Sequence, residues 1–178
     1  MGGKFEFYVT SLIESIPNVV YEVLLLLFCI GTVILLVWKG KRAFKYIVWL
    51  CLSEYVFLLY CSTLIFRTSR TARSISLLPF WSYAHIQAGD KQGLLPENIM
   101  NVLVFIPIGL LLGMACKNKF WRKILGIGLL ISFSIEVLQF CFMKGHCELD
   151  DVIHNTIGCF WGYCLMVGGK KLIQIFIR

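Results

Sequence analysis

The chain has 178 residues, of which 58% are hydrophobic and only 15% charged, with a formal net charge of +7. An average soluble domain has about 45–50% apolar and about 25% charged residues. The composition therefore excludes a disordered chain and argues against a soluble domain. Because a membrane-spanning helix needs about 20 apolar residues, a chain of this length has room for about five.

The N-terminal segment differs from the rest of the chain. Residues 4–16 place apolar side chains at helical spacing, with Lys4, Glu6 and Glu14 between them. This pattern predicts a short amphipathic helix that lies on the membrane surface and ends near Pro17. We therefore assign residues 1–18 to an N-terminal interfacial segment.

Apolar segments separated by basic or polar residues fill most of the remaining chain. We expect them to be helices, because lipid cannot satisfy the exposed backbone groups of an open strand edge. The predicted spans are residues 19–38, 46–66, 99–116, 124–143 and 152–169. The sequence thus predicts an all-α membrane bundle of about five transmembrane helices, in which residues 19–66 hold the two less distinctive spans. Residues 170–178 form a tail.

Lys and Arg are distributed unequally between the two sides of this topology. The first loop, the third loop and the tail carry Lys39, Lys41, Arg42, Lys45, Lys117, Lys119, Arg122, Lys123, Lys170, Lys171 and Arg178. The other side carries Lys4, Arg67, Arg70, Arg73, Lys91 and Lys144. Since cytoplasmic loops are enriched in basic residues, we expect a multi-pass protein of the cell membrane with its N-terminus outside and its C-terminus in the cytoplasm.

The longest loop, residues 67–98, lies outside in this topology. At about thirty residues it exceeds a simple connector, which favours a functional or re-entrant element. Arg67, Arg70 and Arg73 are candidate anion-binding residues. They can meet lipid phosphates, neutralise nearby acids, or bind a phosphate or carboxylate of a ligand.

Polar side chains recur on one face of each of the last three spans, although such residues are costly in lipid. The set is Asn98, Asn101, Glu136, Gln139, Glu148, Asp150, Asp151, His154 and Asn155. An acid at the centre of a membrane helix costs about 2.5–3.5 kcal/mol by insertion scales, so Glu136 must face partners or water, or be protonated. In the predicted topology these residues converge in the outer half of the membrane.

Two interpretations of this polar cluster remain open. In the first, Glu136 and Gln139 only join helices by hydrogen bonds, and the aspartates cap the last helix. In the second, the cluster contacts a ligand. Four glycines on the polar faces predict that the third and fifth spans pack closely, and Pro107 predicts a kink. These glycines are Gly109, Gly113, Gly158 and Gly162.

The eight cysteines do not form a metal-binding framework. All but Cys147 fall within the predicted spans, and the sequence has no CxxC pair. Small, apolar packing is the interpretation that we favour. We therefore expect neither a metal site nor a cofactor.

The polar motifs of the C-terminal half resemble the VanZ-like family of bacterial membrane proteins. The resemblance covers residues 77–165 and rests on motifs in order: Leu78-Pro79-Phe80, Asn98-x-x-Asn101, Phe105-Ile106-Pro107-x-Gly109, Glu136-x-x-Gln139 and Glu148-Leu149-Asp150-Asp151 with Asn155. The founding member is linked to resistance to the glycopeptide antibiotic teicoplanin. The resemblance therefore implies a related bacterial membrane protein. Family members often carry an Arg shortly before the acidic motif, where this chain has Lys144 and His146.

Three functions are compatible with the sequence. The first is a non-enzymatic membrane protein whose outward polar pocket binds a lipid-linked envelope component or a lipoglycopeptide, and we favour it. The second is a membrane enzyme that acts on a lipid-linked phosphate or ester, with Glu148, Asp150, Asp151 and His154 as metal ligands or acid and base. The third is a small transporter subunit, which would need to form a homo-oligomer. No nucleic-acid-binding motif is present.

Overall fold

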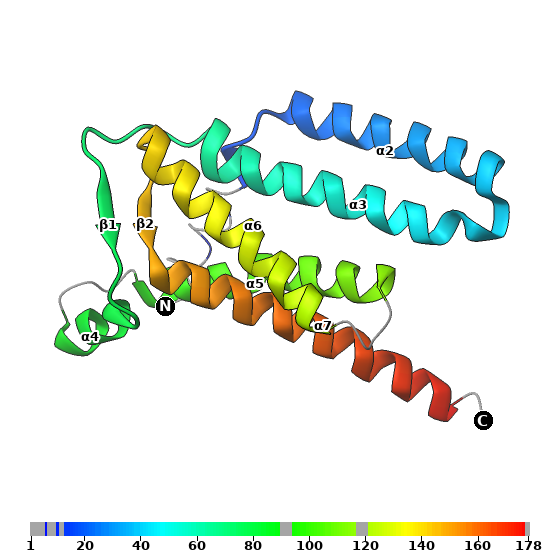
Figure 1. Ribbon diagram of the computed structural model, residues 1–178. Helices are drawn as coiled ribbons and strands as arrows, with labels where there is room; N and C mark the ends of the chain where they lie inside the picture. Colours follow the sequence, from blue (N-terminus) through cyan, green and yellow to red (C-terminus); the bar gives the residue numbers. More distant parts are fainter. Residues whose placement is uncertain (1–5, 7–9, 11–12, 90–93, 117–120, 177–178) are drawn as a thin grey trace.

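Five long helices form a bundle in the computed structural model (Figure 1). The structure describes residues 6, 10, 13–89, 94–116 and 121–176. The helices are α2 (Asn18–Lys39), α3 (Ala43–Tyr60), α5 (Leu94–Ala115), α6 (Trp121–Phe142) and α7 (Leu149–Phe176), and α6 crosses α5 and α7 at an angle. Each helix corresponds to one predicted span, so the predicted all-α bundle is confirmed.

Helical segments that are long and apolar enough to cross a membrane make up most of the described chain. Three such stretches are Asn18–Ile65, Leu94–Ala115 and Trp121–Phe142. The first contains both α2 and α3, which double back at the short 3-10 helix η1 (Gly40–Arg42). Gly40 ends α2 with φ of +49°, a left-handed conformation that glycine adopts without steric cost.

Helix α7 is more polar than the others and is not among these stretches. Asp150 and Asp151 occupy its first turn, where acids favour the positive end of the helix dipole. It nevertheless lies along α5 within the bundle. It also continues to Phe176, so the first residues of the predicted tail are helical.

Helices α5 and α7 pack in backbone contact. A Cβ atom added to Gly158 would lie 2.1 Å from the carbonyl oxygen of Val102, and one added to Gly162 would lie 2.0 Å from that of Ile106. The reverse contact is equally close, since a Cβ on Gly109 would lie 1.8 Å from the carbonyl oxygen of Cys159. The glycines therefore set the distance between the two helices that carry most of the polar cluster.

One end of the bundle carries two short strands and a short helix. After α3 the chain forms a π-helical turn, η2 (Cys61–Ile65), then β1 (Ser74–Ser76) and α4 (Trp81–Ala88). Strand β1 pairs in parallel with β2 (His146–Glu148), which leads into α7. The long loop is therefore a folded element attached to the start of α7, and α5 begins several residues earlier than the predicted residue 99.

The predicted surface helix at the N-terminus falls mostly outside the described residues. Of its described part, Ile13 and Glu14 are helical, and the side chain of Ile16 is only 4% exposed. Ser15 lines a cavity within the bundle. The end of this segment therefore packs against the bundle, because burial of Ile16 removes its apolar surface from solvent.

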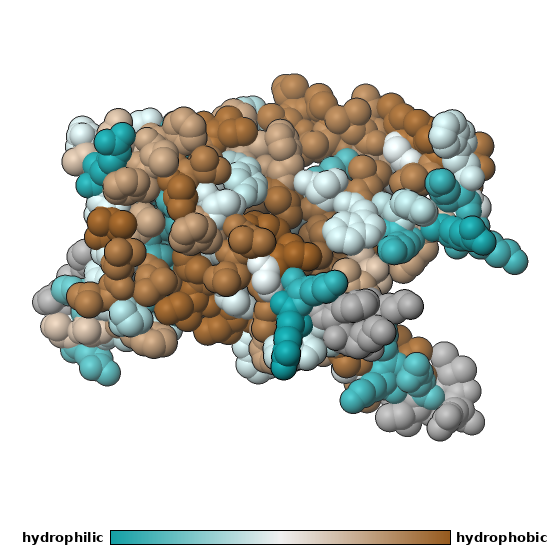
Figure 2. Space-filling view, in the orientation of Figure 1, coloured by the Kyte–Doolittle hydropathy of each residue, from teal (hydrophilic) through white to brown (hydrophobic). Residues whose placement is uncertain are grey.

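Charge and apolar surface are separated along the molecule. Figure 2 shows hydrophobic residues over the long helices and hydrophilic residues gathered at the ends. The η1 turn, the start of α6 and the last turns of α7 bring basic residues to one end of the bundle, opposite α4 and the two strands. Which end faces the cytoplasm stays a prediction from the positive-inside rule.

Candidate functional site

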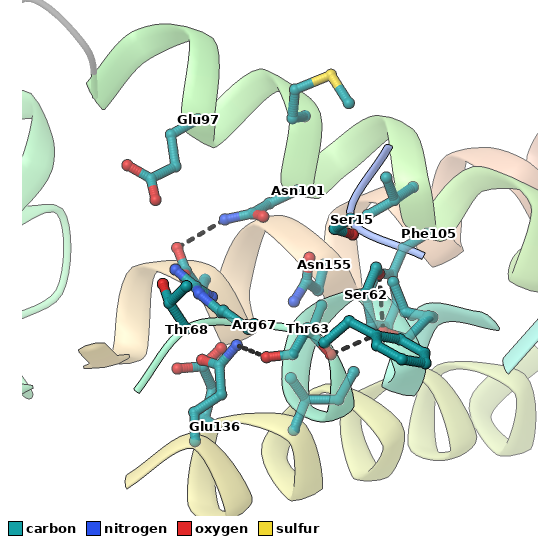
Figure 3. A pocket seen from close by; sticks show the side chains of 17 residues that line it. Ser15, Ser62, Thr63, Arg67, Thr68, Glu97, Asn101, Phe105, Glu136 and Asn155 are labelled. Carbon is teal, nitrogen blue, oxygen red and sulfur yellow. Dashed lines mark hydrogen bonds between the residues drawn. The ribbon is translucent and has the colours of Figure 1, made fainter. Parts of the chain in front are cut away.

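A cavity of about 450 Å³ lies near the end of the bundle that carries the strands and α4. Its walls come from α3, η2, α5, α6 and α7, together with Ser15 of the N-terminal segment and residues 66–68 of the loop after η2 (Figure 3). Side chains predicted as candidates that line it are Arg67, Asn101, Glu136, Gln139, Asp151 and Asn155. The third, fourth and fifth spans thus bring their polar faces together around a space.

Hydrogen bonds join the walls of the cavity to one another. Asn101 of α5 donates through Nδ2 to Oδ1 of Asp151 on α7, at 2.7 Å. Gln139 of α6 donates through Nε2 to the backbone carbonyl of Thr63 in η2, at 3.3 Å. Oε2 of Glu136 accepts the backbone N–H of Glu148 at 2.9 Å. The polar residues therefore hold the helices at fixed positions and also face open space.

Asn155 is a wall residue with an unused hydrogen-bonding atom. It is 5% exposed, and its Nδ2 donates to the hydroxyl of Ser132 on α6 at 2.9 Å. Its Oδ1 is buried and has no hydrogen-bond partner among the described residues. A buried polar atom without a partner is costly, so this oxygen indicates a place for a water molecule or a ligand donor.

A second group of the predicted residues faces α4 instead of the cavity. The carboxylate of Asp150 is fully buried and accepts the backbone N–H groups of Phe80 and Ser82 and the hydroxyl of Ser82. Asn98 donates to the same hydroxyl at 3.0 Å. Asp150 therefore caps the first turn of α4 from a neighbouring helix, rather than capping its own.

Two further contacts attach α4 to the end of β2 and to α7. Trp81 donates its indole N–H to Glu148 at 3.2 Å, and the hydroxyl of Tyr83 lies 2.8 Å from Nε2 of His154. With Asn98 and Asp150, these residues form what we call the α4 clamp. The clamp positions α4, and its residues lie beside the cavity without lining it.

This separation does not fit the alternative in which four residues of the acidic motif hold one metal ion. Glu148, Asp150 and His154 are directed to Trp81, Ser82 and Tyr83, whereas Asp151 points to Asn101 and the cavity. Within the described residues, no group of three or more His, Cys, Asp or Glu is placed to hold a metal ion. Glu148, Asp150 and His154 therefore hold α4, whereas Asp151 lines the cavity.

The three candidate anion-binding arginines also separate. Arg67 lines the cavity, whereas Arg70 hydrogen-bonds to His146 and Arg73 lies 5.8 Å from the centre of the Phe140 ring. Arg70 further donates its backbone N–H to the carbonyl of Met143 at 2.7 Å. Arg70 and Arg73 therefore fasten the loop after η2 to the end of α6, and the three do not form one anion site.

Several lining residues did not stand out in the sequence. Glu97 precedes the predicted third span and reaches the cavity because α5 begins at Leu94. Ser62 and Thr63 lie in η2, where the wider π-helical turn changes which side chains face inward. Glu97 could have been predicted, because it is an acidic residue directly before Asn98. Nothing in the sequence indicated the π-helical turn or the position of Ser15.

Cys147 lies next to the acids and outside the spans. Partial burial raises the pKa of its thiol, and the negative charges of Glu136, Asp151 and Glu148 raise it further. The pKa of this thiol in β2 therefore depends on the charge of the carboxyl groups in the cavity wall.

Comparison with known proteins gives one consistent result. A family model described as VanZ/LLP1 matches residues 46–174. Protein VanZ of Enterococcus faecium is 33% identical over 111 residues, which cover 59% of this chain and 63% of the relative. The match thus spans less than two thirds of the relative's length. No solved structure matches this chain.

Proposed function

Because the chain belongs to the VanZ/LLP1 family, we propose that it is a membrane protein that binds a component of the cell envelope, or a lipoglycopeptide, in its polar cavity. The cavity carries this proposal. It joins carboxyl, amide and hydroxyl groups from four helical segments within a bundle that exposes many large hydrophobic side chains. Binding sites of this kind place a few converging polar groups in a largely apolar pocket.

The size of the cavity fits part of a ligand rather than a whole antibiotic. Pockets for drug-sized molecules have volumes of about 300–1,000 Å³, and this one has about 450 Å³. A polar head group or one sugar would fill it, while an attached lipid chain stays among the apolar helices. Molecules that combine a polar head with a lipid tail therefore suit this site best.

The link of the family to teicoplanin supplies a cellular test. We expect expression of the chain in a susceptible host to reduce susceptibility to teicoplanin, which carries a lipid tail, more than to vancomycin, which does not. Asp151→Asn, which alters the cavity wall, should abolish the effect, whereas Glu54→Gln in α3 should not. Equal susceptibility to both drugs with and without the protein argues against a resistance role.

One observation favours a second candidate function. Glu136 and Asp151 are carboxyl groups on different helices that line the same cavity, and Arg67 lines it with them. Such a pair can act as acid and base on a lipid-linked phosphate or ester, with Arg67 at the phosphate. If Glu136→Gln and Asp151→Asn variants keep full function in cells, the enzymatic candidate fails.

A further inference from the structure

Each amide side chain in the wall of the cavity donates a hydrogen bond to another group of the protein. Asn101 donates to Asp151, Gln139 donates to the carbonyl of Thr63, and Asn155 donates to Ser132. A primary amide has NH₂ donors at one end and an acceptor oxygen at the other. Each of these three amides therefore uses one of its two N–H donors within the protein.

Asn155 brings a buried hydrogen-bond acceptor to the wall of the cavity. Its side chain is 95% buried and lines the cavity, and its Oδ1 has no partner within the described part of the protein. Because an unsatisfied buried acceptor costs free energy, a ligand that brings an N–H or O–H donor to this point gains more than one that brings another acceptor.

The ionisable residues around the cavity favour a positive charge. Carboxyl groups of Glu97, Glu136 and Asp151 line it, and Arg67 is the basic residue among the described lining residues. In Figure 3, Glu97 and Glu136 lie on opposite sides of the Arg67 side chain. Three carboxyl groups face one guanidinium, and a cation that enters the cavity favours the ionised form of these carboxyl groups and is attracted to it.

We infer that the cavity binds the protonated primary amine of its ligand, with Asn155 and Asp151 as hydrogen-bond acceptors. A primary ammonium carries three N–H donors and one positive charge, which complements Oδ1 of Asn155, unpartnered among the described residues, and the surplus of carboxyl groups. This inference rests on the proposed use of the cavity as a ligand site. It names the chemistry of the group bound, which either an aminophospholipid or an amino sugar can supply.

A bare divalent cation fits the same cavity less well. Calcium takes six to eight oxygen ligands at about 2.3–2.6 Å, which requires the acceptors to converge on one point. In Figure 3 the Arg67 side chain lies between those of Glu97 and Glu136, and the cavity has a volume of about 450 Å³. An ammonium on a carbon skeleton fills such a space and needs only some of the acceptors.

The first experiment compares head groups on a constant tail. The full chain, purified in a neutral detergent, is titrated with octylamine, octanol, octyl phosphate, octyltrimethylammonium and CaCl₂, and binding is followed by the fluorescence of its five tryptophans. We expect octylamine to bind about tenfold or more tightly than the other alkyl probes. Octyltrimethylammonium separates charge from N–H donation, since it has no N–H. Binding of octanol, octyl phosphate, octyltrimethylammonium or Ca²⁺ as tight as that of octylamine overturns the inference.

Variants then place the amine in the cavity. Asn155→Ala removes the free acceptor and should weaken octylamine binding about tenfold. Ser132→Ala removes the same internal hydrogen bond but keeps Oδ1 of Asn155, so its binding should change much less. Asp151→Asn should weaken binding, while Glu54→Gln serves as the matched control. Unchanged affinity in both Asn155→Ala and Asp151→Asn overturns the inference, and the comparison of head groups decides even where a variant fails to fold.

Competition identifies the source of the amine. Short-chain phosphatidylethanolamine and octyl glucosaminide are each added to protein saturated with octylamine. Displacement by the first assigns an aminophospholipid, and displacement by the second assigns an amino sugar. If neither displaces octylamine, the inference fails. This failure is distinct from failure of the proposed function. The drug-susceptibility test measures the effect of the protein in cells, and that effect does not depend on whether the bound group is an amine.

Discussion

Asp150 and Ser82 are 68 positions apart in sequence, yet Oδ2 of Asp150 accepts both the hydroxyl of Ser82 and its backbone N–H, the latter at 3.0 Å. Both residues are fully buried. The N–H of Phe80, a residue with φ of +60°, donates to the other carboxylate oxygen. One side chain of α7 therefore fixes the start of α4 and holds Phe80 in a conformation that non-glycine residues seldom adopt.

Removal of this carboxylate should destabilise the end of the molecule that carries α4. Asp150→Ala leaves the partly buried N–H of Phe80 and the buried N–H of Ser82 without an acceptor, which we expect to cost about 3 kcal/mol. The measurement is the apparent melting temperature of the purified chain, together with limited proteolysis between residues 77 and 93. Asp150→Asn keeps one acceptor oxygen and should lose less. The exposed Glu22 supplies the control Glu22→Gln, and an Asp150→Ala variant as stable as this control would show that the α4 clamp contributes little.

The close packing of α5 and α7 predicts a strong dependence on glycine position. Gly158→Ala and Gly162→Ala each place a methyl group within about 2 Å of a backbone carbonyl oxygen, so the helices must move apart. We expect each to cost about 1–3 kcal/mol, the usual cost of overpacking. Gly168→Ala and Gly126→Ala are matched controls, because nothing lies within 4 Å of the added Cβ. These controls should be neutral or stabilising, since alanine favours helices. Thermal unfolding in detergent measures all four.

Cysteine accessibility tests the predicted orientation. Cys147 in β2 and Cys116 after α5 lie near opposite ends of the bundle. In single-cysteine variants expressed in intact cells, a membrane-impermeant maleimide should label Cys147, and should label Cys116 only after the cells are permeabilised. The reverse pattern would place the cavity end in the cytoplasm.

The pH dependence of this labelling depends on the raised pKa of the Cys147 thiol. Since the thiolate is the reactive form, a raised pKa means that less of it is present at a given pH, and labelling should increase only at higher pH than for an exposed cysteine. Burial is the main cause, and Glu136 is one of the negative charges that add to it. Glu136→Gln should therefore move the labelling profile to lower pH. A profile that does not move would mean that Glu136 carries no charge in this pH range.

Arg67 separates a cationic ligand from an anionic one. If the cavity binds an ammonium, Arg67→Gln removes a competing positive charge and should strengthen octylamine binding a few-fold. If the cavity binds a phosphate, the same change should weaken binding of octyl phosphate. Arg70→Gln is the control, because Arg70 contacts His146 and does not line the cavity. Arg67→Gln should therefore raise the affinity for a cationic ligand and lower the affinity for an anionic one.

Much of the fold was predictable because lipid imposes simple rules on sequence. A segment that crosses the bilayer must be apolar and helical, so the five long helices were visible as apolar segments. The VanZ-like resemblance, carried by the ordered motifs around Asn101, Glu136 and Asp151, is confirmed by the family match. The short strands and α4 were not predicted, since they depend on pairing between segments about seventy residues apart.

The sequence by itself determined which residues lie on the polar face of each helix, because helical periodicity fixes the direction of a side chain around its own axis. Asn101, Glu136 and Asp151 were therefore predictable as a converging set. Only the tertiary structure decided that the neighbouring Asp150 and Asp151 serve different partners, one holding α4 and the other lining the cavity. Adjacent residues on a helix point about 100° apart, and what each one meets depends on neighbouring elements that periodicity does not position.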